Sequence, residues 1–459
     1  MNGKNVIKLL DASEISPNDY SSARHRKMTL TRREFLGSAL GASLAPGAVR
    51  TILGAGIARA PQPEVKGRRT LGWRAHHVAE IPRGYQLAVA DVNGDGKPEV
   101  LALSSEKNIV EWYENPSWRR RAITTKTSRN ISLAPLFRKG SLRNGIALAA
   151  DFALEDSEHG GSLWWAEPRE TFDSEWSLRP VAAIPTSHRL RWADLNGDGN
   201  PELVDAPIVG FGARPPDFSV VAPLTWFEPP EGIVRPRASG AKEEVEGWTP
   251  HLIDRSLTVV HGINILDWDG DGRDEILTAS FEGVHLFDST GRGLELRWKK
   301  TRLAAGDQSP KPGISSGAAV RKGSSEIGVG KVAGRRFLAT LEPWHGEQVV
   351  VYFEERRGQL WQRNVIDESF RDGHALACAD LDGDGNDEIV AGFRGTGTSL
   401  HVYYATDASG LRWERQTLDT DMAASGVAVA DLDGDGRLDV VAIGASTGNV
   451  KWYENLGNS

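Results

Sequence analysis

The chain has a single cysteine, Cys378, among its 459 residues, so no internal disulfide is available to stabilise it. It also lacks an excess of positive charge, because 54 Lys and Arg stand against 62 Asp and Glu and the formal net charge is −8. An acidic chain is a poor partner for nucleic acid or for an anionic membrane surface. We therefore expect no nucleic-acid partner. Without a disulfide, we expect the stability of the fold to come from closure of the fold on itself or from bound metal.

A long apolar run is missing as well. The most apolar N-terminal stretch, residues 38–58, is rich in Gly and Ala and is interrupted by Arg50. It is therefore a poor membrane span, and we expect no stable span in the mature protein.

The segment just before this stretch carries a different signal. Residues 31–37 contain Arg32 and Arg33 and resemble the twin-arginine export motif, which a receptor reads. Residues 1–60 are therefore predicted to be a signal region for the twin-arginine export machinery, with Met28 as an alternative start. The mature protein is expected to be exported, periplasmic or extracellular. The alternative is a basic tail that is not an export signal.

Five segments of the remaining chain share one pattern: an apolar run, then D-x-[DN]-G-D-G-x-x-[DE], then a second apolar run. Carboxylates or amides at loop positions 1, 3, 5 and 9 place oxygen ligands around a hard cation such as Ca²⁺. Ala102 at position 12 of the first loop, and strand-like flanks, exclude an EF-hand. The alternative is an acidic turn without metal, which five equal copies disfavour. The predicted calcium ligands are Asp91, Asn93, Asp95, Glu99, Asp194, Asn196, Asp198, Glu202, Asp267, Asp269, Asp271, Glu275, Asp380, Asp382, Asp384, Glu388, Asp431, Asp433, Asp435 and Asp439.

Tryptophans mark the start of another strand in each unit. They precede the five loops by about eighteen residues, and two more, Trp118 and Trp298, open similar strands without such a loop. A third kind of strand, of which Trp112-Tyr113-Glu114-Asn115 is one copy, also recurs seven times. The pattern predicts an all-β fold, a seven-bladed β-propeller of four-stranded blades over residues 73–459, after a linker at 61–72.

The order of the strands predicts how the ring closes. The chain ends just after the third strand of the last blade, so the strand at Trp73 is expected to complete that blade from the N-terminal side. Closure removes the sheet edges that would otherwise aggregate. On these residues the units resemble FG-GAP or VCBS repeats, as in integrin-type propellers, a resemblance that implies the fold and not an activity.

Residues at the start of each first strand are expected to meet on the face opposite the calcium loops. Six residues before the first Asp of the loop, the five regular blades carry Tyr85, His188, His261, His374 and Ser425. Three His in five equivalent positions exceed chance for a chain with 11 His in total. The alternative is that these His are solvated tips or strand caps.

Loops between second and third strands point to the same face. One of them contains Glu342 and His345, and others contribute Lys107, Glu282 and Arg394. Imidazoles suit transition metals such as Zn²⁺ or Mn²⁺, or they act as acids and bases near neutral pH.

Two stretches, residues 374–385 and 342–346, resemble the propeller domain of the fungal aldos-2-ulose dehydratase family. That resemblance implies elimination of water from keto-sugars. It makes a carbohydrate lyase or dehydratase one hypothesis, with a small carbohydrate as substrate. The residues expected to act are His188, His261, His345 and His374, assisted by Tyr85 or Glu342. The other hypothesis is a non-catalytic, calcium-stabilised binding or scaffold propeller, which leaves the one-sided His set without a purpose.

Overall fold

The computed structural model describes residues 70–138, 144–169, 171–230, 233, 247–291, 293, 295–312 and 320–458. Contacts divide the chain into two units, 1–62 and 63–459. The predicted export signal lies outside the described residues. Within the described part of the second unit the regular elements are strands, and no helix there is long and apolar enough to cross a membrane.

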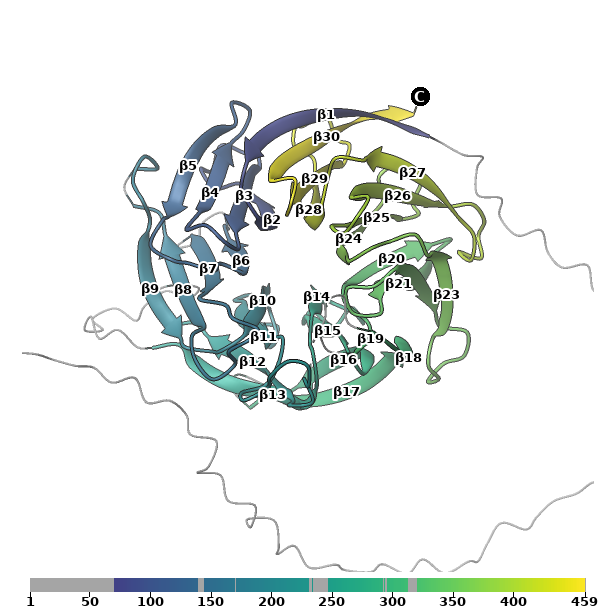
Figure 1. Ribbon diagram of the computed structural model, residues 1–459, viewed down its shortest axis with the longest axis horizontal. Helices are drawn as coiled ribbons and strands as arrows, with labels where there is room; N and C mark the ends of the chain where they lie inside the picture. Colours follow the sequence, from purple (N-terminus) through teal and green to yellow (C-terminus); the bar gives the residue numbers. More distant parts are fainter. Residues whose placement is uncertain are drawn as a thin grey trace, which may run out of the picture. The chain divides into compact units, whose positions relative to one another are not determined.

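Seven four-stranded antiparallel sheets form the blades of a ring, as the repeats predicted (Figure 1). The first three are β2 (Gly84–Ala90), β3 (Glu99–Ser104), β4 (Val110–Glu114) and β5 (Arg119–Thr124); β6 (Ser132–Leu136), β7 (Gly145–Ala150), β8 (Ser162–Glu167) and β9 (Ser177–Ala182); and β10 (Ser187–Ala193), β11 (Glu202–Pro207), β12 (Ala222–Glu228) and β13 (Thr249–Leu257).

The fourth to sixth blades are β14 (Gly262–Leu266), β15 (Glu275–Ser280), β16 (Gly283–Thr290) and β17 (Arg297–Ala304); β20 (Ile327–Val332), β21 (Arg335–Glu342), β22 (Gln348–Phe353) and β23 (Gln362–Asp367); and β24 (Gly373–Ala379), β25 (Glu388–Phe393), β26 (Ser399–Ala405) and β27 (Trp413–Asp419). A small additional sheet, β18 (Asp307–Lys311) with β19 (Arg321–Gly323), lies between blades 4 and 5 in the chain.

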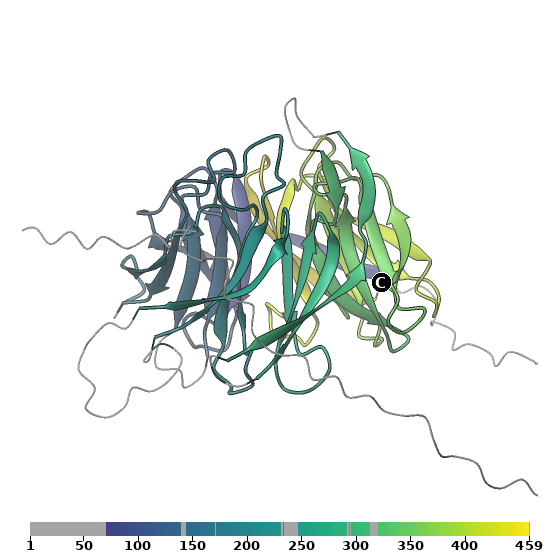
Figure 2. The same ribbon diagram turned by 90° about the horizontal axis from the view of Figure 1, so that it is seen from below.

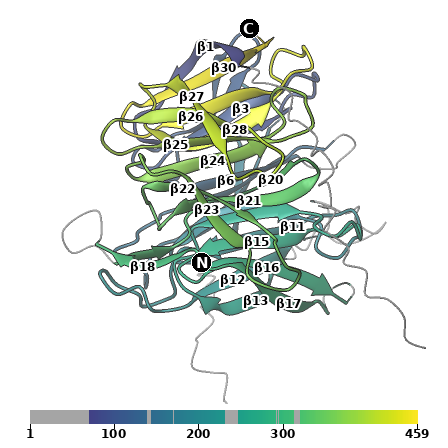
Figure 3. The same ribbon diagram turned by 90° about the vertical axis from the view of Figure 1, so that its right-hand side faces the viewer.

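The seventh blade closes the ring with both ends of the unit. Its strands are β28 (Ala424–Ala430), β29 (Asp439–Gly444), β30 (Asn449–Asn458) and β1 (Leu71–Glu80). The N-terminal strand β1 pairs with β30 at the rim, where Trp73 is opposite Asn455, and Figure 3 shows the two strands side by side. The predicted closure is confirmed, but β1 begins at Leu71, two residues inside the predicted linker, because Leu71 already pairs with Asn458.

The first strand of each blade lies nearest the axis. Each of these seven strands contacts the first strands of both neighbouring blades, so they form a complete inner ring that includes a contact between β2 and β28. The strands run from one face of the ring to the other, and loops gather on both faces (Figure 2). The calcium-type loops join first to second strands, so the starts of the first strands lie on the opposite face.

Aromatic side chains fill the space between blades. Trp112, Trp165, Trp176 and Trp226 are at most 2% exposed. The apolar clusters combine residues of neighbouring blades, as where Phe337 of blade 5 joins Ile389 of blade 6. Stability therefore arises from blade-to-blade packing around the ring, as is typical of repeat folds.

Candidate active site at the centre of the ring

The predicted histidines of the first strands lie at the centre of the ring. His188 is in β10, His374 is in β24, and His261 directly precedes β14. Their exposed fractions are 1%, 2% and 0%, so the alternative of solvated tips is wrong for these three. Burial of three imidazoles near one axis needs polar partners, because an unpaired buried polar group costs about 1–3 kcal/mol.

His345 joins them from the loop between β21 and β22. Its Nε2 lies 2.9 Å from Nε2 of His261, and its ring centroid lies 5.2 Å from that of His374. The ring of His188 lies 4.7 Å from that of His261. The φ angle of His345 is 52°, a left-handed conformation that a non-glycine residue adopts at a cost. The four predicted His therefore form one cluster, called the His cluster below.

Tyr85, from β2, bridges two members of the cluster. Its hydroxyl lies 2.8 Å from Nε2 of His188 and 3.2 Å from Nε2 of His374. The phenol has one proton to donate, so it can serve only one of these nitrogens at a time. Tyr85 therefore lies in the His cluster, beside two of the histidines that it was expected to assist.

The Nδ1 atoms of two cluster members are held by fixed acceptors. His374 donates from Nδ1 to the carbonyl oxygen of Ser425 at 2.6 Å. Nδ1 of His261 lies 3.1 Å from the carbonyl oxygen of Ser325 and 3.1 Å from Oε1 of Glu326. These contacts place the proton on Nδ1 and leave the Nε2 lone pair facing the cluster.

Nδ1 of His345 faces a carboxylate, as Nδ1 of His261 does. Nδ1 of His345 lies 3.1 Å from Oδ1 of Asp372, and Nε of Arg394 donates to Oδ2 of Asp372 at 2.8 Å. Arg394 thus holds Asp372 in place, and both groups face Nδ1 of His345, because NH2 of Arg394 lies 3.2 Å from that nitrogen. Arg394 was one of the charges expected at this opening, and the structure brings it to the cluster.

The environment keeps the imidazoles neutral. Burial, reinforced by the Arg189 guanidinium, lowers the pKa of His188 well below its usual value. Burial and Arg394 do the same for His374, and they lower the pKa of His345 to about 3. Neutral imidazoles are the form that accepts protons and binds metals.

Two charged residues that the sequence pattern did not identify complete the site. Arg189 donates to Oε1 of Glu326 at 2.6 Å, and its NH1 lies 3.0 Å from Nε2 of His188. Burial opposes ionisation of Glu326, but Arg189 and His261 outweigh it and lower its pKa to about 2. Arg189, Glu326 and Tyr85 also line a small cavity of about 70 Å³ beside His374.

Glu342 takes a different place from the one expected. It is completely buried and accepts hydrogen bonds from Ser324, Thr340 and Tyr352, while Arg363 donates to its second oxygen at 2.9 Å. These contacts occupy the carboxylate within and beside blade 5. Among the described contacts, none joins Glu342 to the His cluster.

The donor set of the His cluster is suitable for a transition metal. One ring nitrogen each from His261, His345 and His374 lies within 4.8 Å of the other two. Each of these rings has an acceptor near its other nitrogen, the arrangement that orients metal-binding imidazoles. Three protein ligands leave further positions open to a substrate, as in catalytic zinc sites.

The calcium-type loops lie on the other face and share one local structure. In the first, Asp91 accepts the N–H groups of Gly94 and Gly96, and Glu99 accepts that of Val92. The carboxylates of Asp267, Asp269 and Asp271 in the third loop lie within 4.8 Å of one another, and similar groups occur in the fourth and fifth. Burial and neighbouring carboxylates raise the pKa of Glu99 and Glu275 to about 7 and of Glu388 to about 9. A bound cation would relieve this repulsion.

Comparison with known proteins agrees with this architecture. The family described as "Aldos-2-ulose dehydratase, beta-propeller domain" matches residues 160–355, which include His188, His261 and His345. An FG-GAP-like repeat matches residues 380–442, and an FG-GAP repeat matches residues 83–105.

One curated relative is aldos-2-ulose dehydratase from Phanerodontia chrysosporium. It is 24% identical over 309 residues, which cover 63% of this chain and 32% of the relative. The chain thus spans about a third of the length of that relative. From its repeats, its blades and these matches, the protein is a seven-bladed propeller with FG-GAP repeats that resembles the propeller domain of aldos-2-ulose dehydratase.

Proposed function

We propose that the protein is an exported carbohydrate lyase that catalyses β-elimination on a keto-sugar or keto-glycoside at the His cluster. The observation that carries the proposal is the convergence of four imidazoles and one phenol at the centre of the ring, with the imidazoles held neutral. A scaffold propeller has no need to bury these groups together. The resemblance to a dehydratase propeller supports the same chemistry.

Elimination needs a base for the proton next to the ketone. Neutral His188 is the proposed base, and its Nε2 exchanges its contacts with the Tyr85 hydroxyl and NH1 of Arg189 for the substrate proton. The α-carbon loses its proton to His188, and the electron pair of that C–H bond forms the new double bond.

The leaving oxygen needs a proton. Tyr85 is the proposed donor, since its hydroxyl contacts both His188 and His374. The C–O bond breaks, the departing oxygen takes the phenolic proton, and the proton on His188 returns to Tyr85 through their hydrogen bond. The products are an enone and water or an alcohol, and the enzyme regains its starting state.

Negative charge that develops on the ketone oxygen must be stabilised. A transition metal such as Zn²⁺ or Mn²⁺, held by His261, His345 and His374, would supply Lewis-acid polarisation of that ketone. The guanidinium groups of Arg189 and Arg394 flank the same site and offset negative charge. Asp372 and Glu326 orient the imidazoles and touch no reacting atom in this scheme.

The test is an absorbance assay for the enone with a panel of keto-sugars and keto-glycosides, on the full-length protein supplied with Zn²⁺ or Mn²⁺. Loss of a general acid–base group costs roughly 100-fold or more in rate, so His188→Ala should fall by that much. His77→Ala is the matched control, because His77 is exposed on β1 and pairs with Glu80. No turnover by wild type on any of these substrates, or equal rates for wild type and His188→Ala, would favour the scaffold hypothesis.

A further inference from the structure

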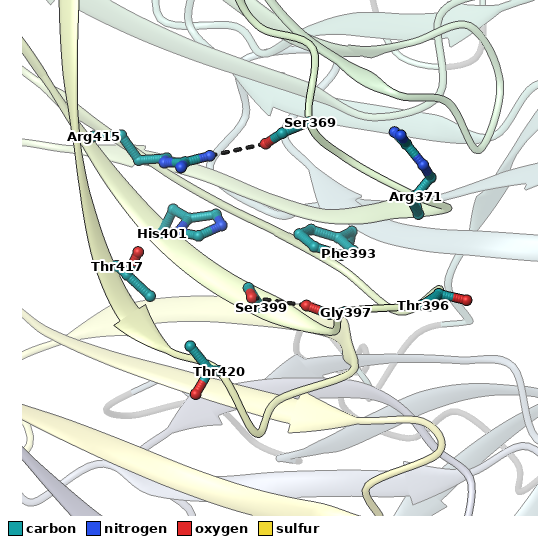
Figure 4. A pocket seen from close by; sticks show the side chains of 10 residues that line it. All are labelled: Ser369, Arg371, Phe393, Thr396, Gly397, Ser399, His401, Arg415, Thr417 and Thr420. Carbon is teal, nitrogen blue, oxygen red and sulfur yellow. Dashed lines mark hydrogen bonds between the residues drawn. The ribbon is translucent and has the colours of Figure 1, made fainter.

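A second pocket lies on blade 6, on the same face as the His cluster. Its volume is about 420 Å³, within the range of roughly 300–1,000 Å³ typical of small-molecule sites. Figure 4 shows the ten side chains that line it. They are Ser369, Arg371, Phe393, Thr396, Gly397, Ser399, His401, Arg415, Thr417 and Thr420.

The lining carries positive charge and no carboxylate. Arg415 donates to Asp367 at 2.9 Å and to Ser369 at 2.8 Å, so its charge is partly offset from outside the pocket. Among the described residues, the Arg371 guanidinium donates only to the carbonyl oxygen of Phe370 and forms no ion pair. The pocket is therefore suited to an anionic group, which a guanidinium binds by charge-assisted hydrogen bonds.

One lining residue of the pocket is a buried imidazole. His401 is 5% exposed, and its Nδ1 is buried without a hydrogen-bond partner in the described part of the chain, so a ligand in the pocket would meet the other ring nitrogen, Nε2. Its ring lies beside Phe393, with centroids 6.2 Å apart (Figure 4). Burial, with Arg415 nearby, lowers the pKa of His401 to about 4, so the ring is neutral and can both donate and accept.

The remaining lining groups are those that bind sugars. Five hydroxyl side chains, those of Ser369, Thr396, Ser399, Thr417 and Thr420, offer donors and acceptors for the hydroxyls of a sugar. Phe393 adds an apolar ring to the lining, against which C–H groups can pack.

The pocket and the His cluster are linked by two consecutive residues. Arg371 lies in the pocket, and the next residue, Asp372, orients His345. The backbone of this segment is tied to the segment after β25, because Gly395 donates to the carbonyl oxygen of Arg371 at 2.8 Å and Arg394 donates to that of Asp372 at 3.1 Å. A ligand in the pocket would therefore lie next to Asp372, which contacts His345 of the His cluster.

We propose that this pocket on blade 6 is a separate binding site for an acidic sugar, whose carboxylate pairs with Arg371 and whose hydroxyls contact the Ser and Thr side chains and His401. The site does not depend on the elimination activity. Its ligand is a hydroxylated ring with one oxyanion, as in a uronic acid.

Titration calorimetry at low ionic strength with D-glucuronate, D-glucose and sodium sulfate tests the proposal on the full-length protein. D-glucuronate should bind about tenfold or more tightly than either D-glucose or sulfate, because only it offers both the charge and the hydroxyls. Equal binding of D-glucose would refute the role of charge, and equal binding of sulfate would show an adventitious anion site only.

Variants separate this pocket from the His cluster. Arg371→Gln should weaken D-glucuronate binding by about tenfold or more, while Arg412→Gln, an exposed arginine of the same blade, should leave it unchanged. His401→Phe keeps a ring and removes the nitrogen, and it should also weaken binding. His374→Ala, which disables the His cluster, should retain it. Wild-type affinity in Arg371→Gln, or loss of binding in His374→Ala, would overturn the assignment.

Discussion

At the scale of single residues, charged groups that contact the imidazoles from outside the His cluster fix their positions. Asp372 contacts His345 from the side away from the cluster, and Arg394 fixes Asp372. Removal of a carboxylate in this position usually lowers metal affinity or activity by about 10–100-fold.

Asp372→Asn is therefore expected to weaken Zn²⁺ or Mn²⁺ binding by about 10–100-fold while the fold stays intact. Competition with a chromophoric chelator gives the affinity, and the melting temperature reports on the fold. High metal concentration should restore part of the rate, which separates a positioning residue from a catalytic one. Unchanged affinity would mean that Asp372 only neutralises Arg394.

A second prediction concerns a buried asparagine at the ring seam. Asn455 is fully buried, and its Nδ2 donates to the carbonyl oxygens of Leu381 in blade 6 and Leu438 in blade 7. Asn455→Ala leaves both carbonyls without this partner and should cost about 1–3 kcal/mol in urea unfolding. Asn364→Ala, which removes one exposed bond to Leu411, should cost much less. Equal costs would contradict the role of Asn455 in joining blades.

The sequence predicted part of the site, for a reason visible in these residues. Tyr85, His188, His261 and His374 occupy equivalent positions relative to a repeated loop, so their convergence follows from strand order. Glu326 belongs to blade 5, which has no such loop to fix its position in the repeat. Arg189 and Asp372 become site residues only through contacts with other blades, which no local pattern records, although both adjoin predicted segments.

At the scale of the element, the calcium-type loop is the repeating unit. Its ninth residue is buried at the start of the second strand, as Glu99 and Glu388 show with exposed fractions of 0% and 3%. The loop is also tied to the next blade, since Asn115 donates to Leu432 of the fifth loop and Ser289 to Leu195 of the second. Ordering a loop therefore supports the neighbouring blade as well as its own.

Calcium should raise the melting temperature, because a ligand that binds only the native state stabilises it by mass action. Thermal unfolding with excess Ca²⁺ and with EGTA measures the difference. Asp271→Ala, in the third loop, should reduce the gain without abolishing it, since four other loops remain. Identical curves with and without calcium would contradict the assignment of these loops as cation sites.

The calcium-free protein should show a distinct dependence on pH. The pKa values of Glu99, Glu275 and Glu388 in the folded state, about 7, 7 and 9, lie above the usual 4.5. The folded state then binds more protons than the unfolded state, so stability falls as pH rises from about 4.5 to 9. Bound Ca²⁺ should remove this decline, because it replaces the protons. Melting curves in EGTA that stay level across this range would argue against it.

Blades 2 and 5 lack the calcium-type loop, and the sequence pattern describes this part of the fold less completely. Blades 2 and 5 were expected from strand counts alone, and the structure confirms both as four-stranded sheets. The additional pair of β18 and β19 was not expected, because β19 has only three residues and neither strand has the aromatic pattern of the repeat.

At the scale of the whole molecule, closure joins the ends of the propeller. Strand β1 pairs with β30 along its length, and Trp118 of blade 1 packs against Trp452 of blade 7 with ring centroids 5.7 Å apart. Deleting residues 73–80 should lower solubility and stability far more than deleting residues 61–69 of the predicted linker, because residues 73–80 belong to β1 and their loss exposes the edge of β30. Equal effects of the two deletions on the melting temperature and on aggregation would contradict closure by β1.

The proposed route of export is also a property of the whole molecule. A propeller with one cysteine, Cys378, needs no oxidative step and can fold before translocation. Replacing Arg32 and Arg33 by Lys should leave unprocessed precursor inside the cell, which fractionation and immunoblotting detect. Normal processing of that double variant would exclude the twin-arginine pathway.

The most direct test of the account is the metal content of the full-length protein after reconstitution with Zn²⁺ or Mn²⁺ and removal of excess metal. We predict about one equivalent of transition metal per chain, in addition to calcium, as for a catalytic three-histidine site. His261→Ala and His374→Ala should lose it, whereas His77→Ala should retain it. Wild-type protein that retains no transition metal, or His261→Ala and His374→Ala variants that retain as much as wild type, would contradict the assignment of the His cluster as a metal-dependent active site.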